Sequence, residues 1–181
     1  ILLAMDKKVL VIDSTVNQKA KYIVPVIMPT KAYVTEFEKI DVAVGFNNYN
    51  EIKEYLGLPL HAELPYDLAL LDIDSFENLN NFEVKSEDTN YFVTGLDLYT
   101  LKRGLEILSG LTEIMKLTKV VFSKNASKED DDYLNYLALG YKVAWNEEIV
   151  YFPFEVGDQS VIAENQRVAK IKFKRLSDQY K

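Results

Sequence analysis

The chain contains no cysteine and a single histidine, His61, among its 181 residues. The first absence excludes a disulfide framework and a thiolate metal site, and the second excludes a histidine-rich metal site and a Ser-His-Asp triad. Glycine is scarce as well, with seven residues, and none of them belongs to a glycine-rich phosphate-binding loop. For His61, which lies in a proline-flanked loop, we expect an ordinary surface position.

Long apolar runs are also missing. No run approaches the roughly 18 residues of a membrane-spanning helix, and no signal peptide is present, so the sequence predicts a soluble, cytoplasmic protein. The net charge of −7 argues against a generally basic surface for nucleic acid. With 48% hydrophobic residues the chain can form a sizeable core, and we expect residues 1–181 to form a single domain.

Two apolar runs end abruptly on aspartate. Residues 7–13 read Lys-Lys-Val-Leu-Val-Ile-Asp, and residues 66–72 read Tyr-Asp-Leu-Ala-Leu-Leu-Asp. Such runs are typical of buried strands in a parallel sheet, and ligands of open α/β sheets bind beyond the carboxyl ends of these strands. We therefore expect Asp13 and Asp72 to face one crevice, where two acids could hold Mg²⁺ and a phosphate group. The alternative is that these acids merely cap helices that follow the strands.

The remaining pattern alternates short apolar strands with helices. The helix over 51–56 is expected to have Asn50 as its N-cap, and another helix is expected to be capped by Ser127. This alternation predicts an α/β fold, a three-layer sandwich with a mainly parallel central sheet. The expected strands cover 9–12, 42–46, 68–71, 91–94, 120–122 and 149–152, and the further helices cover 98–116 and most of 161–181.

The order of these signals resembles the MinD/ParA-like division of P-loop NTPases, which includes the TadZ/CpaE-type pilus-assembly proteins. Residues 7–13 resemble the family's "GKKVLLIDAD" strand, and residues 66–72 resemble its Walker B strand. Residues 91–108 are similar to the "vlVttpe-slkra" segment. Residues 119–124 match the strand end beside adenine, and 150–154 resemble the "iPyd" strand end.

The resemblance implies an ATP- or ADP-binding protein with Mg²⁺. It assigns Asp72 to the metal and Asp13 to the metal's water shell or the switch region. Ser123, Lys124 and Pro153 would line the adenine rim. ATP would join two subunits as a homodimer, whose function would be to position or regulate a larger assembly such as a pilus, secretion or partition machine.

One departure from the family is the phosphate loop. Residues 1–5 read as the end of the family's first helix, so the loop and the strand before it would lie upstream of Ile1. That strand would pair beside the one ending at Asp72, and without it two ladders would stay unpaired at a cost of ~1–3 kcal/mol per buried group. We therefore predict that further residues precede Ile1.

Other departures concern catalysis. Thr15 stands where the family has a second acid, and a hydroxyl is a poor general base; losing such a base costs ~10²–10⁴ in rate. Ser123 replaces an asparagine that can both donate to and accept from adenine. Asp74 stands where the family has small residues or proline. The sequence thus predicts at most a slow ATPase, a nucleotide switch, or a non-catalytic interaction scaffold.

A response-regulator receiver domain is the main alternative. In that interpretation Asp72 is phosphorylated, Asp13 supplies the neighbouring acid, Thr94 holds the phosphoryl oxygen and Lys124 neutralises it. The long separation of Asp13 from Asp72, and Ser14 where receivers have a second acid, argue against it.

The segment 170–175 carries four cations and could touch a nucleic-acid backbone or an anionic membrane. The net charge does not support either partner, and a solvated helix face is the better explanation of the segment.

Overall fold

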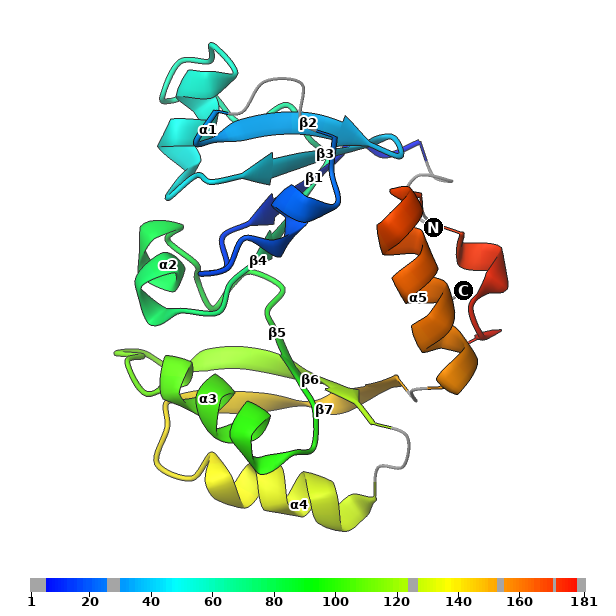
Figure 1. Ribbon diagram of the computed structural model, residues 1–181. Helices are drawn as coiled ribbons and strands as arrows, with labels where there is room; N and C mark the ends of the chain where they lie inside the picture. Colours follow the sequence, from blue (N-terminus) through cyan, green and yellow to red (C-terminus); the bar gives the residue numbers. More distant parts are fainter. Residues whose placement is uncertain (1–5, 26–29, 124–126, 153–154, 171, 179–181) are drawn as a thin grey trace. The chain divides into compact units, whose positions relative to one another are not determined.

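The computed structural model describes residues 6–25, 30–123, 127–152, 155–170 and 172–178. The chain divides into two compact units. The first comprises Ile1–Glu83 with Gln166–Ile171, and the second comprises Val84–Asn165 with Lys172–Lys181. Each unit has its own β-sheet (Figure 1). The expectation of one domain over residues 1–181 stays a prediction.

The first unit contains a four-stranded sheet in the order β2-β3-β1-β4. The strand β1 runs parallel to both of its neighbours, β3 and β4, whereas β2 pairs antiparallel with β3. The bounds are Val9–Asp13 for β1, Tyr33–Phe37 for β2, Ile40–Val44 for β3 and Leu68–Asp72 for β4. The helices are the 3₁₀ helix η2 (Lys19–Tyr22), α1 (Tyr49–Tyr55) and α2 (Phe76–Asn81).

The core of this unit forms around β1, because its aliphatic residues are covered on both faces of the sheet. Leu10 and Ile12 are fully buried. A cluster of buried side chains from β2, β3 and the segment after η2 packs against Val11 of β1: Val24, Tyr33, Val42 and Val44. Packing around β1 therefore fixes where its carboxyl end emerges.

The second unit contains the all-parallel sheet β5-β6-β7, made of Tyr91–Thr94, Met115–Phe122 and Val143–Phe152. Its helix α3 (Leu98–Leu108) buries Leu101, Leu105 and Leu108. Gly104 of α3 lies so close to Phe92 that a Cβ there would come within 2.7 Å of the ring, which allows the helix to pack closely on β5. The other helices are α4 (Lys128–Leu137), α5 (Val156–Val168) and the 3₁₀ helix η3 (Phe173–Arg175).

The predicted α/β class with mainly parallel strands is confirmed, and the described strands pair as two sheets. The predicted capping by Ser127 is also confirmed, since Ser127 and Asp130 form a reciprocal capping box at the start of α4. β4 and β5 are each an edge strand of their own sheet among the described residues. In the same part of the chain, no helix combines the length and apolar character needed to cross a bilayer.

Three predicted helix boundaries are wrong. The helix expected over 98–116 ends at Leu108, and Met115 already begins β6. The N-cap of α1 is Asn48 rather than Asn50, because the Asn48 side chain accepts a hydrogen bond from the Glu51 N–H at 2.9 Å. The helix expected over 161–181 begins earlier, at Val156, and ends at Val168, where Ala169 adopts a left-handed conformation with φ of 48°.

Candidate functional site

Asp13 and Asp72 are the last residues of two neighbouring parallel strands. They are paired with each other in the register of β1 and β4. The pairing continues one residue further, since the Ser14 N–H donates to the Asp72 carbonyl at 3.0 Å. The two carboxylates therefore lie side by side at the carboxyl-terminal end of the four-stranded sheet.

The Asp13 carboxylate holds the loop that follows β1. Asp13 is only 5% exposed, and its Oδ1 accepts from the Thr15 N–H at 3.0 Å and from the Thr15 hydroxyl at 2.6 Å. Its Oδ2 accepts from the Ala20 N–H, in η2, at 2.8 Å. Asp13 thus ties the segment after its strand to the strand end, through Thr15 and through Ala20 of η2.

Thr15 has a matching role in the same loop. Its hydroxyl donates to Asp13 and accepts from the Gln18 N–H at 3.1 Å. Both hydrogen-bonding functions of this hydroxyl are therefore used within the loop, which agrees with the expectation that it is a poor general base.

The environment of Asp72 is electrostatically unfavourable to its negative charge. Partial desolvation of the carboxyl, whose side chain still reaches solvent, raises its pKa above the usual value, and the charges of Asp13 and Asp74 raise it further. The Lys19 ammonium, in η2, acts in the opposite direction and lowers it. A cation placed near Asp72 would relieve the repulsion among these three carboxylates.

Asp74 and Asn78 join the loop after β4 to the loop after β1. Asp74 Oδ1 accepts from the Val16 N–H at 2.7 Å, and the Asn78 side-chain amide donates to the Ser14 carbonyl. Asn78 is positioned by Ser75, whose hydroxyl caps α2 by accepting from the Asn78 N–H at 3.2 Å. The sequence analysis did not identify Asn78 or Lys19. Ser75 could have been recognised as the N-cap of α2, but no pattern in the sequence indicates that Asn78 contacts Ser14.

Of the three residues predicted for the adenine rim, Lys124 and Pro153 lie outside the described residues. Ser123 belongs to the second unit, where its N–H donates to the Phe152 carbonyl at 3.1 Å, just beyond the end of β6. Thr94, the receiver-type candidate, also belongs to the second unit; it is buried, and its hydroxyl donates to the Gly95 carbonyl at 2.9 Å. The roles predicted for these residues stay predictions.

The donor set at the strand ends suits one kind of metal. Among the described residues no group of three or more histidine, cysteine, aspartate or glutamate side chains is arranged to hold a metal ion. Mg²⁺ does not need such a group, because it keeps several waters and binds through one or two carboxylates together with phosphate oxygens. Asp72, with Asp13 beside it, fits that requirement.

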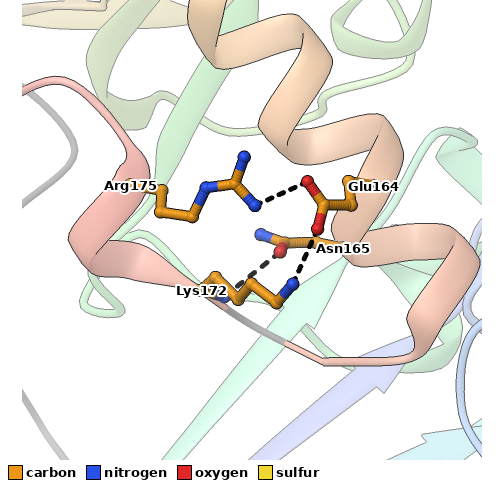
Figure 2. A network of polar contacts seen from close by, with 4 residues as sticks. All are labelled: Glu164, Asn165, Lys172 and Arg175. Carbon is orange, nitrogen blue, oxygen red and sulfur yellow. Dashed lines mark hydrogen bonds and ion pairs between the residues drawn. The ribbon is translucent and has the colours of Figure 1, made fainter.

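The basic segment near the carboxyl end is folded against α5 (Figure 2). Lys172 Nζ and Arg175 Nη1 contact the two oxygens of Glu164 at 2.7 and 2.6 Å, and both cations lower the pKa of Glu164. Further along, buried Asp158 accepts from the N–H and hydroxyl of Ser177, each at 2.7 Å. The cations of this segment are exposed to solvent, and two of them are paired with Glu164. The segment follows α5, which ends at Val168, and includes the 3₁₀ helix η3 rather than lying on the expected longer α-helix.

No protein-family model matches this chain, and no curated protein matches it either. Among solved structures it is similar to a protein from Borrelia burgdorferi B31, provisionally named a plasmid partition protein and crystallised with AMPPNP. The TM-score is 0.53 at 14% sequence identity, and the match covers 99% of this chain and 84% of the other. At this identity the likeness shows the fold alone, an α/β fold with mainly parallel strands.

Proposed function

We propose that this chain is the nucleotide-binding switch of a larger assembly, similar to MinD/ParA-like proteins. The observation that carries the proposal is the pairing of Asp13 and Asp72 at the carboxyl ends of adjacent parallel strands, where partial desolvation and the nearby carboxylates of Asp13 and Asp74 raise the pKa of Asp72 in spite of Lys19. The fold shared with a partition protein crystallised with AMPPNP supports it. The ligand would be ATP or ADP with Mg²⁺.

In this proposal Asp72 accepts hydrogen bonds from the water shell of Mg²⁺, and the metal supplies charge neutralisation for the phosphate oxygens. Asp13 has a second role, because the same carboxylate fixes Thr15 and Ala20. A change in the charge balance around Asp13 and Asp72 would therefore alter the hydrogen bonds that hold residues 15–20. This coupling makes the loop the element that would respond to nucleotide.

We expect hydrolysis to be slow or absent. The loop offers Thr15 where a general base would be needed, and its hydroxyl is already engaged with Asp13 and Gln18. A missing general base lowers a rate by ~10²–10⁴. The proposed output is therefore the bound state itself, expressed as homodimerisation in the cytoplasm and as positioning of a partition, pilus or secretion assembly.

The test is calorimetric titration of the full-length protein with Mg²⁺-ATP and, in parallel, with Mg²⁺-ADP. Asp72→Asn should weaken Mg²⁺-dependent binding at least about tenfold, the equivalent of about 1.4 kcal/mol. The matched control is Asp132→Asn on the exposed surface of α4, which should leave binding unchanged. Unchanged affinity in Asp72→Asn would contradict the site assignment.

The same titration separates the alternatives. Absence of binding at millimolar ATP would favour the non-catalytic scaffold. If ATP fails to bind but beryllofluoride binds in an Asp72-dependent manner, the receiver interpretation would be favoured.

A further inference from the structure

Tyr33, the first residue of β2, lies in one row with the two acids of the candidate site. The register pairs Asp72 with Asp13, Asp13 with Val44, and Val44 with Tyr33. Side chains of directly paired residues project from the same face of a sheet, so Tyr33 shares a face with both carboxylates. That face is the one on which η2 lies, since Ala20 packs against the cluster that contains Tyr33 and Val44.

The Tyr33 hydroxyl is a buried donor without a partner. The residue is 9% exposed, and its Oη forms no hydrogen bond with any residue that the structure describes. Tyr66, by contrast, donates its hydroxyl to Asp41 at 2.8 Å. Buried polar groups are nearly always hydrogen-bonded in folded proteins, so an unpaired one marks a place where an acceptor is expected.

Asp13, the acid whose charge acts on Tyr33, is already engaged by the loop after β1. Its two carboxylate oxygens accept from Thr15 and Ala20. Burial raises the pKa of the Tyr33 hydroxyl, and the Asp13 charge raises it further. One loop therefore both engages Asp13 and covers the face on which Tyr33 lies.

We propose that Tyr33 is a further binding residue of the strand-end site, and that its hydroxyl donates a hydrogen bond to a phosphate oxygen of the bound nucleotide. This inference rests on the proposed function, because the phosphate belongs to Mg²⁺-ATP. A free anion does not fit, since the carboxylates of Asp13 and Asp72 would repel it. A phosphate oxygen accompanied by Mg²⁺ is suited to the place, because the metal offsets that repulsion.

The loop that covers Tyr33 is also the loop that would respond to the metal. A cation near Asp13 and Asp72 competes for the Asp13 carboxylate and weakens its hydrogen bonds to the N–H groups of Thr15 and Ala20. When η2 moves away from this face, Tyr33 exchanges an unpaired hydroxyl for a hydrogen bond to a charged acceptor. The nucleotide-bound arrangement thus gains a contact that the free one lacks, as a shift between two states requires.

The test is Tyr33→Phe in the full-length protein, which removes one oxygen atom and keeps the ring. In calorimetric titration with Mg²⁺-ATP the affinity should fall about tenfold, a typical loss for one hydrogen bond to a charged group. In thermal unfolding without nucleotide the melting temperature should stay unchanged or rise, because the substitution removes a buried donor that lacks a partner. The matched control is Tyr55→Phe, at a half-exposed tyrosine of α1 in the same unit, which should change neither quantity.

The two measurements distinguish the ways in which the inference can fail. If the unmodified protein binds no Mg²⁺-ATP, the proposed function fails and this inference fails with it. If Tyr33→Phe binds as tightly as the unmodified protein, the proposed function stands and the role of Tyr33 is refuted. A lower melting temperature of Tyr33→Phe without nucleotide would also refute it, because the hydroxyl would then already be paired in the free protein, with Asp13 or with a buried water.

Discussion

Replacing Asp131 by alanine should destabilise the second unit more than replacing Lys119 by methionine. Lys119 projects from β6 and is 3% exposed at its side chain, whereas the Asp131 side chain on α4 is 21% exposed. The Lys119 ammonium contacts Asp131 Oδ1 at 2.5 Å and Asn135 Oδ1 at 2.7 Å, and it lies 5.2 Å from the centre of the Trp145 ring.

The magnitudes follow from which group is left without a partner. Asp131→Ala leaves a buried ammonium without its counterion, which costs about 3–5 kcal/mol. Lys119→Met leaves a carboxylate that can still reach water and keeps its contact with the Asn135 amide at 3.2 Å, so we expect about 1–2 kcal/mol. The double variant should cost less than the sum of the two, with a coupling free energy of about 1–3 kcal/mol.

Urea unfolding followed by tryptophan fluorescence measures this directly, because Trp145 is the only tryptophan in the chain and contacts both Lys119 and Phe92. Its signal reports the unit that contains the ion pair. The reasoning is refuted if the two single variants cost the same, or if their effects add without coupling. Either result would mean that Lys119 is solvated in solution.

Three other predictions concern the first unit and the carboxyl-terminal segment. The pKa of Asp72 is raised on folding, so its charge opposes folding increasingly as pH rises from the ordinary value of that pKa through the raised one. Asp72→Asn should flatten this decline and raise the melting temperature near neutral pH, measured by thermal unfolding with and without Mg²⁺. Gly45→Ala should lower the free energy of unfolding in urea by about 2 kcal/mol or more, because φ is 84° and the new Cβ would lie 2.2 Å from the Lys31 carbonyl oxygen. Gly57→Ala is the control: φ is 69°, but the space around the new Cβ is open, so the loss should be about 1 kcal/mol. Glu164→Gln should speed amide exchange in residues 172–178, because it removes the partner of Lys172 and Arg175. The pKa of Glu164 is lowered on folding, so protonating Glu164 should have the same effect as the substitution when the pH falls through this lowered pKa. Equal exchange in both proteins would show that these ion pairs do not hold the segment.

The strands around the candidate site could be predicted because their sequences leave little choice. Val9–Asp13 and Leu68–Asp72 are uninterrupted aliphatic runs that end on an acid. The strand β2 was missed for a physical reason. Its turn into β3 uses Glu38 and Lys39, both with positive φ (52° and 67°), where hairpins usually signal themselves with Asn-Gly or Asp-Gly. Only tertiary pairing holds those two residues in that conformation.

The helix α3 was predicted too long because Leu111 and Met115 continue its spacing by chance. The chain leaves the helix after Leu108, and Met115 instead pairs with Val143 in the sheet. At the candidate site the two acids were found, but Lys19 and Asn78 were not. Their positions depend on how the segments 14–20 and 73–78 fold over the strand ends. The spacing of residues in the sequence does not predict this folding.

The strand order β2-β3-β1-β4 has a consequence for the order in which the first unit can form. The hairpin β2-β3 is local, joined by a two-residue turn, and can close early. The strand β1 leaves the ribosome before either of its partners, yet it pairs with β3 and with β4, which is made much later. During synthesis the edge of Val9–Ile12 that pairs with β4 therefore stays unpaired until β4 emerges, and in this interval the nascent chain most needs protection by chaperones.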